Sequence, residues 1–120
     1  MNTAETGSRG EAAAAEWLRS NGFELCERNW RNGRYEIDII ARKAGELHIV
    51  EVKTRRSGSL TPPEAAITRQ KELALRKAAQ CYAAWTRWPG EIRFDLAAVE
   101  MRPDGSARVD FIPDAIQMHW

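Results

Sequence analysis

Apolar residues recur along the chain at two spacings, and the spacing predicts which segments are strands and which are helices. Alternation at every second position predicts strands over residues 23–29, 35–41, 47–53 and 92–98, with a last strand around residues 109–112. Steps of three, four or seven residues predict two helices, one over residues 10–21 and one that ends at about residue 86. The expected order is helix, three strands, helix, two strands.

Each expected helix begins at a capping box, in which a hydroxyl residue is followed three positions later by glutamate. Ser8 and Glu11 form this pair before the first helix, and Thr61 and Glu64 form it before the second. The second helix has one apolar stripe, and we expect its aromatic residues to lie in the core rather than against nucleic-acid bases. The stripe consists of Ile67, Ala74, Ala78, Cys81, Tyr82 and Trp85.

The order of the elements predicts an α/β fold with a mixed central sheet flanked by helices. Only a short loop separates strands 35–41 and 47–53, so these two strands should pair antiparallel. The long helix joins strand 47–53 to strand 92–98, and such a crossover makes its two strands parallel. No linker or repeat divides the sequence, so residues 1–120 are expected to form a single domain.

Charged residues interrupt the second expected strand, which is otherwise rich in isoleucine. Alternation places Glu36 and Asp38 on one face of this strand, with Ile37 and Ile39 on the opposite face. An unpaired charge among such residues is costly, so these carboxylates should have a partner or face solvent. The next strand repeats this pattern.

Glu51 and Lys53 lie on one face of strand 47–53, and their position relative to Asp38 decides what they can do. If Asp38 lies across from Glu51, two carboxylates and one ammonium converge. One or two carboxylates with water and phosphate oxygens bind Mg²⁺ well, so Asp38 and Glu51 are the expected ligands of Mg²⁺ or Mn²⁺. Lys53 would then orient or deprotonate the attacking water. A structural salt bridge or a solvated sheet face is the alternative interpretation.

Glu11 has two interpretations as well. As the third residue after Ser8 it would cap its own helix, which is worth about 1 kcal/mol and needs no catalytic role. Alternatively, it is an additional carboxylate that reaches toward the metal. The sequence alone favours the cap.

The net charge of +1 conceals a basic middle of the chain. Residues 28–87 carry 13 Lys and Arg residues against 6 Asp and Glu residues. Such a segment could bind nucleic-acid phosphates, although a solvated helix surface has the same composition. The candidate phosphate contacts are Arg55, Arg56, Arg69 and Lys71.

Composition excludes several other classes of protein. The sequence of 120 residues is 43% hydrophobic and 29% charged, which is typical of a packed globular domain. No apolar run approaches the length that crosses a bilayer, and the first residues carry charges where a secretory signal would be apolar, so we expect a cytoplasmic protein without membrane association. The two cysteines and two histidines are dispersed and match no zinc motif.

Several motifs together resemble the YraN family of bacterial proteins, which is similar in turn to the archaeal Holliday-junction resolvases and the PD-(D/E)XK nucleases. The motifs are Gly7 to Glu11, Asn29-Trp30-Arg31, Glu36 to Ala41, Val50 to Arg55, Pro63 to Ala66 and Arg93-Phe94-Asp95. The resemblance implies a restriction-endonuclease-like αβββαβ core. It also implies that Asp38, Glu51 and Lys53 form the nuclease signature and that Glu11 is its additional acid from the first helix. Tyr35 departs from the family, which usually has glycine there.

The resemblance favours a metal-dependent endonuclease that acts on branched or structured DNA. A nuclease fold that binds DNA or a repair protein without cleaving anything is the second hypothesis. A protein-interaction scaffold with Trp88 and Trp120 as exposed anchors is the third. A homodimer would suit an enzyme that cuts two strands, although no residue argues for it directly.

Overall fold

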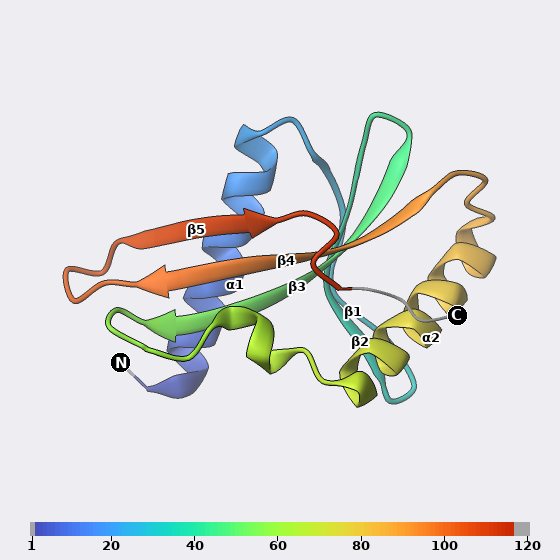
Figure 1. The fold of residues 1–120 in the computed structure, drawn as a ribbon. Coiled ribbons are helices and arrows are strands. Elements are labelled where there is room, and N and C mark those ends of the chain that lie inside the picture. The colour runs from blue at the N-terminus through green and yellow to red at the C-terminus, as the bar shows by residue number, and fades with distance from the viewer. Residues whose placement is uncertain (1, 117–120) are drawn as a thin grey trace.

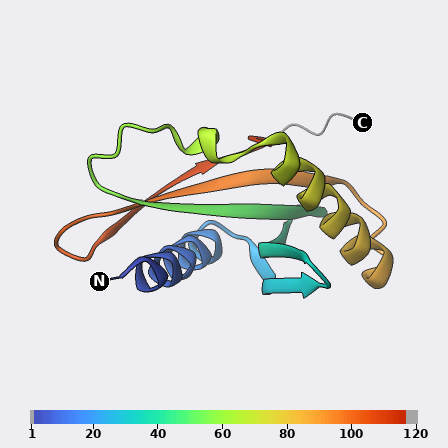
Figure 2. The ribbon, with the colours of Figure 1, turned by 90° about the horizontal axis from the view of Figure 1, so that it is seen from below.

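The computed structural model describes residues 2–116. These residues form a five-stranded sheet with a helix on each face (Figures 1 and 2). The strands lie in chain order across the sheet, and only β3 and β4 are parallel. This confirms the α/β class, the mixed sheet, the antiparallel hairpin and the parallel crossover. In chain order the elements are α1 (Thr3–Ser20), β1 (Glu24–Asn32), β2 (Tyr35–Lys43), β3 (Glu46–Arg56), the 3₁₀ helix η1 (Pro63–Ala66), α2 (Arg69–Thr86), β4 (Ile92–Met101) and β5 (Ala107–Ile112).

Each helix covers its own hydrophobic cluster on the sheet. Ala14 and Leu18 of α1 pack on Val50 and Ile39 of one face, while Leu75 and Tyr82 of α2 pack on the opposite face. The interior strand β4 is buried on both faces from residue 94 to residue 99, so its expected half-burial is wrong. A strand covered on both sides reads as a continuous apolar run. Among residues 2–116, no helix is both long enough and apolar enough to span a membrane.

The first helix begins at Thr3, well before the predicted start. Asn2 is the N-cap, and its side-chain oxygen accepts a hydrogen bond from the Glu5 N–H at 2.9 Å. Asparagine caps helices as well as serine does, so the earlier cap extends the helix by two turns. Ser8 and Glu11 therefore lie inside α1, and the predicted capping box is wrong. Glu11 does not cap this helix, which removes the simplest explanation for that residue.

The second helix begins later than predicted. The segment Pro63–Ala66 forms the separate 3₁₀ helix η1, and α2 starts at Arg69 with Thr68 as its N-cap, so the box at Thr61 is also wrong. The Thr68 hydroxyl accepts a hydrogen bond from the Lys71 N–H at 3.1 Å, which places Lys71 in the first turn of α2. The predicted apolar stripe of this helix is confirmed at Tyr82, which is buried. It is wrong at Trp85, which is 69% exposed and lies outside the core.

α1 lies very close to β3 at Gly10. A Cβ atom at Gly10 would lie 1.8 Å from the Thr54 hydroxyl oxygen, far inside van der Waals contact. Only glycine lets the helix backbone lie this close to β3. This contact identifies Val52 and Thr54 as the residues of β3 that face α1. Glu51 and Lys53 therefore share the opposite face, as predicted, and this face is the one that α2 covers.

Substitution of Gly10 by alanine should therefore destabilise the protein by about 2 kcal/mol, because the new methyl group forces α1 away from Thr54. Chemical denaturation measures the change in unfolding free energy. Gly7→Ala is the matched control, since a Cβ at Gly7 meets no other described atom within 4 Å. Alanine there should stabilise the helix by about 0.5–1 kcal/mol. Equal effects at the two positions would contradict the role assigned to the Gly10 contact.

Candidate functional site

β2 and β3 separate at the centre of the sheet, and the candidate site lies at this fork. Their ladder ends at the pair Ile39 and Val50, whereas β2 remains paired with β1 as far as Tyr35. The first residues of β2 therefore leave β3 together with β1. Alternation predicts that Ile37 and Ile39 share one face of this strand, and that prediction is wrong. Ile39 packs on the α1 side of the sheet and Ile37 packs on the α2 side, because β2 changes direction between them.

Asp38 is the first residue of β2 beyond the end of this ladder. Its Oδ2 atom accepts a hydrogen bond from the Val52 N–H at 2.9 Å, so the carboxylate takes the place of a strand partner. Burial raises the pKa of Asp38 above its ordinary value, and the charge of Glu11 adds to the rise, while the Val52 N–H and Lys71 oppose it. The fork thus holds Asp38 over β3 in a poorly solvated position.

Glu51 of β3 is the second carboxylate of the site, and it is largely buried. Its side chain is 13% exposed, and its Oε1 atom lies 3.1 Å from the Lys71 ammonium. The other oxygen, Oε2, is buried and has no hydrogen-bond partner within residues 2–116. Burial, followed by the charge of Asp38, raises the pKa of Glu51 to about 7. The surrounding positive charge and hydrogen bonds therefore do not fully stabilise the ionised form of Glu51.

The amine that reaches these carboxylates is Lys71 rather than Lys53. Burial by itself would lower the pKa of Lys71, but the charges of Glu51, Asp38 and Glu36 outweigh it and raise that pKa. Lys53 lies on the same face of β3 as Glu51, as predicted, but its side chain is exposed and lines a separate hollow of about 190 Å³. Its assignment to the attacking water stays a prediction.

Two further carboxylates act on the pair through their charge. Glu11 of α1 raises the pKa of Asp38, so the structure brings the predicted additional acid into the electrostatic surroundings of the site. Glu36 raises the pKa of both Asp38 and Glu51, and it also forms an ion pair with Arg31 at 3.4 Å. The site is thus predominantly acidic, with Lys71 as its closest cation.

The four candidate phosphate contacts do not form one cluster. Lys71 lies at the carboxylates, and Arg69 is exposed at the first residue of α2. Arg55 donates a hydrogen bond to the Thr61 carbonyl and lines the same hollow as Lys53. Arg56 borders a different hollow of about 500 Å³, and Arg55 and Arg56 share a third, smaller hollow at the start of α1.

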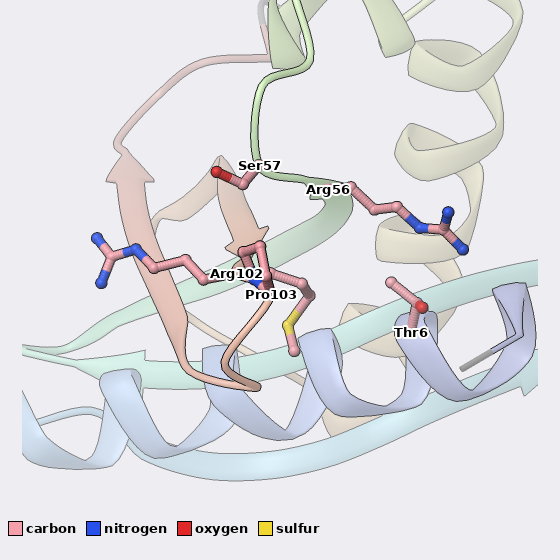
Figure 3. Close-up of a pocket in the computed structure, with 6 residues that line it drawn as sticks. Thr6, Arg56, Ser57, Arg102 and Pro103 are labelled. Atoms are coloured by element: carbon pink, nitrogen blue, oxygen red, sulfur yellow. The ribbon is translucent and has the colours of Figure 1, made fainter.

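The hollow beside Arg56 lies between the start of α1 and the β4–β5 turn (Figure 3). Figure 3 shows the guanidinium groups of Arg56 and Arg102 pointing in opposite directions, away from each other. Met101 and Pro103 supply apolar surface between them. Because its cations diverge, this hollow does not surround an anion.

The two central carboxylates meet the chemical requirements of a divalent cation. Within residues 2–116, no three His, Cys, Asp or Glu side chains are gathered in the manner of a complete metal centre. Mg²⁺ does not need one, because it commonly uses one or two carboxylates and completes its shell with water and phosphate oxygens. The unpartnered Oε2 of Glu51 and the desolvated carboxylate of Asp38 are the oxygen ligands that such an ion prefers.

Sequence reasoning did not place Lys71 at the carboxylates or recognise the surroundings of Tyr35. Lys71 depends on where α2 begins, and the false capping box at Thr61 concealed that start. Tyr35 lines a hollow with Arg34 and residues of α2, from Gln70 to Lys77. A basic residue beside an aromatic one, facing a basic helix, is the signal that could have indicated this surface.

The fold and the fork define an α/β protein whose mixed sheet carries a largely buried pair of carboxylates. The chain belongs to the uncharacterised protein family UPF0102, whose family model matches residues 10–99. It is 39% identical over 111 residues to a UPF0102 protein of Bacteroides thetaiotaomicron, an alignment that covers 92% of this chain and 91% of the relative. A UPF0102 protein of Nitratidesulfovibrio vulgaris is 40% identical over 114 residues, with 94% and 84% covered. These matches confirm the expected YraN-like family, which is the UPF0102 family.

Proposed function

We propose that this protein binds nucleic acid and is a metal-dependent endonuclease that cleaves branched or structured DNA. The observation that carries the proposal is the buried, unpartnered Oε2 atom of Glu51 beside the desolvated carboxylate of Asp38. This arrangement is costly for the metal-free protein, because Lys71 compensates only part of the desolvated negative charge. A cation at this point would compensate it.

The element order also supports this proposal. A helix, three strands, a helix and a further strand precede β5, which agrees with the αβββαβ core of the PD-(D/E)XK nucleases. The acids and the lysine of the proposed signature lie on two adjacent strands, with Glu11 on the preceding helix. A fold supports many activities, so the carboxylate pair, not the fold, carries the argument.

Asp38 and Glu51 would hold the ion, which we expect to be Mg²⁺ or Mn²⁺. When bound, the ion supplies positive charge that stabilises the negative charge developing on the phosphate. Glu11 adds negative charge next to Asp38 and thereby strengthens the attraction of the site for a cation. Lys53 would orient the attacking water or accept its proton, and Lys71 would leave Glu51 to contact a phosphate of the bound strand.

A specific observation favours a second function, that of a DNA-binding or adaptor module without cleavage. Lys71 already lies 3.1 Å from Glu51 and neutralises part of the acidic site without any metal. In that case Glu51 and Lys71 form a structural pair, and the exposed cations of β3 and α2 bind phosphates by charge alone. Such binding weakens steeply as salt is raised and needs no divalent ion.

The scaffold hypothesis receives little support from its two tryptophans. Trp88 is half-buried, packs against the α2 cluster and donates a hydrogen bond from its ring nitrogen to the Glu91 carbonyl at 3.0 Å, so its prediction as an exposed anchor is wrong. Trp120 lies outside the described residues. A homodimer stays a prediction, which sedimentation of the purified protein would test.

Purified protein incubated with a four-way DNA junction, a flap and a linear duplex of the same sequence should cleave the branched substrates in Mg²⁺ or Mn²⁺. Replacing these ions with EDTA should abolish cleavage, because two carboxylates alone repel the phosphate. Gel electrophoresis of end-labelled strands measures the products. Salt-sensitive binding to all three substrates without cleavage in either metal would instead establish the adaptor function.

A further inference from the structure

The hollow at Tyr35 has a volume of about 580 Å³ and lies between the tip of the β1–β2 hairpin and α2. Residues of both elements line this hollow, and the hairpin tip lies near α2 in Figure 1. One wall belongs to the start of β2 and the other to the outward side of α2. The lining residues are Arg34, Tyr35, Gln70, Leu73, Ala74 and Lys77.

The lining combines a stacking surface with polar groups at its margin. The Arg34 guanidinium carbon lies 5.5 Å from the centre of the Tyr35 ring, and an Arg34 nitrogen lies 3.5 Å from the phenol oxygen. A planar cation against an aromatic ring is a surface on which a nucleobase stacks well. Leu73 is 41% exposed and adds apolar area, while Gln70 offers an amide that both donates and accepts hydrogen bonds.

Lys77 gives the hollow its second cation. Its ammonium acts on the Tyr35 phenol, since Arg34 and then Lys77 lower the pKa of that phenol against the effect of burial. Arg34 and Lys77 therefore both act on the Tyr35 hydroxyl group. A ligand with a flat aromatic part and an attached phosphate would satisfy the ring, the apolar wall and the cations together.

The hollow adjoins the carboxylate pair through two chain neighbours. Glu36 follows Tyr35 in β2, and its charge reaches both Asp38 and Glu51. Lys71 follows Gln70 in α2, and its ammonium contacts Glu51. A strand with one phosphate at the carboxylates would therefore place a neighbouring nucleotide at the hollow.

We propose that this hollow binds an unstacked base of a single DNA strand, next to the phosphate held at Asp38 and Glu51. The inference rests on the proposed function and deepens it by naming the part of the substrate that is recognised. Paired bases keep their faces covered within the duplex, whereas the strands at a branch point contain bases that can turn outward. Recognition of such a base would select branched or single-stranded substrates over intact duplex.

The test compares a twelve-residue thymidine strand with an abasic strand of the same length and phosphate number, by fluorescence anisotropy in Ca²⁺. Wild type should bind the strand with bases roughly fivefold to tenfold more tightly, the effect of stacking one base. Tyr35→Leu should reduce this ratio to about one, and Tyr35→Phe should retain most of it because the ring remains. Lys77→Gln should weaken both strands equally, since it removes a phosphate contact. Arg108→Gln, on the exposed strand β5, is the control that should change nothing.

Each outcome decides the inference. A ratio that Tyr35→Leu lowers and Tyr35→Phe preserves supports base recognition in this hollow. A ratio that is equal in wild type and Tyr35→Leu, or a wild type that binds both strands alike, overturns the inference and leaves the proposed function standing. A wild type that binds neither strand nor branched DNA overturns the proposed function as well. Circular dichroism of each variant shows whether it has folded.

Discussion

Asp38→Asn should lose at least about a hundredfold of the metal-dependent cleavage rate on branched DNA while the fold is retained. Asparagine keeps the size of the side chain, and its oxygen can still accept the hydrogen bond from the Val52 N–H. The substitution removes the negative charge that a divalent ion requires. Initial rates with a labelled four-way junction in Mg²⁺ measure the loss, and Mn²⁺ titration calorimetry should show weakened binding of the ion.

Two lysine variants separate the roles at this site. Lys53→Ala should abolish cleavage but leave Mn²⁺ binding intact, because its side chain does not contact Glu51 among the described residues. Lys71→Ala should tighten Mn²⁺ binding, since the cation that competes for Glu51 is gone. Cleavage that persists equally in Asp38→Asn, Lys53→Ala and wild type would point to a contaminating nuclease and refute the assignment.

Glu51→Gln should make the metal-free protein more stable than wild type at pH 8, by about 3 kcal/mol. The pKa of Glu51 rises from an ordinary value of 4.5 to about 7 on folding, so the native state binds more protons than the unfolded state between these pH values. The unfolding free energy of wild type therefore falls as the pH rises from about 4.5 to about 7. Glutamine carries no charge and escapes this loss.

Urea denaturation of both proteins at pH 4 and pH 8 in EDTA measures the effect. The two should have similar stability at pH 4 and differ at pH 8. Glu16→Gln is the control, because the Glu16 side chain is 72% exposed and its removal should shift stability by less than about 0.5 kcal/mol at either pH. Mg²⁺ should then stabilise wild type and not Glu51→Gln. A pH-independent difference between these two proteins would show that Glu51 is adequately solvated.

The sheet was predictable because its register depends on local patterns. Ile- and Val-rich segments with a short connection identified the β2–β3 hairpin, and one long crossover fixed β3 and β4 as parallel. Helix starts were less predictable, since a chain often has more than one acceptable cap. Asn2 and Thr68 act as caps, whereas the boxes at Ser8 and Thr61 do not.

The candidate site was predictable in its acids and not in its cations. The sequence predicts that Asp38 and Glu51 lie on adjacent strands but leaves their register open, and the ladder ends one pair before the two residues would stand opposite each other. The fork between the strands does not follow from the sequence, because the departure of β2 depends on how β1 and α2 pack. Lys71 reaches Glu51 from a distant helix, and Asp95, which is 1% exposed, pairs with His48 at 2.7 Å across two strands. Such contacts depend on tertiary structure.

The close approach of Gly10 to Thr54 also has an electrostatic consequence. Glu11 is the next residue of the helix, so the glycine that lets the helix settle on the sheet also determines how near the Glu11 charge lies to Asp38. A larger residue at position 10 would lift the helix and carry this carboxylate away. A residue with no side chain and no charge would thus tune the affinity of the neighbouring acids for a cation.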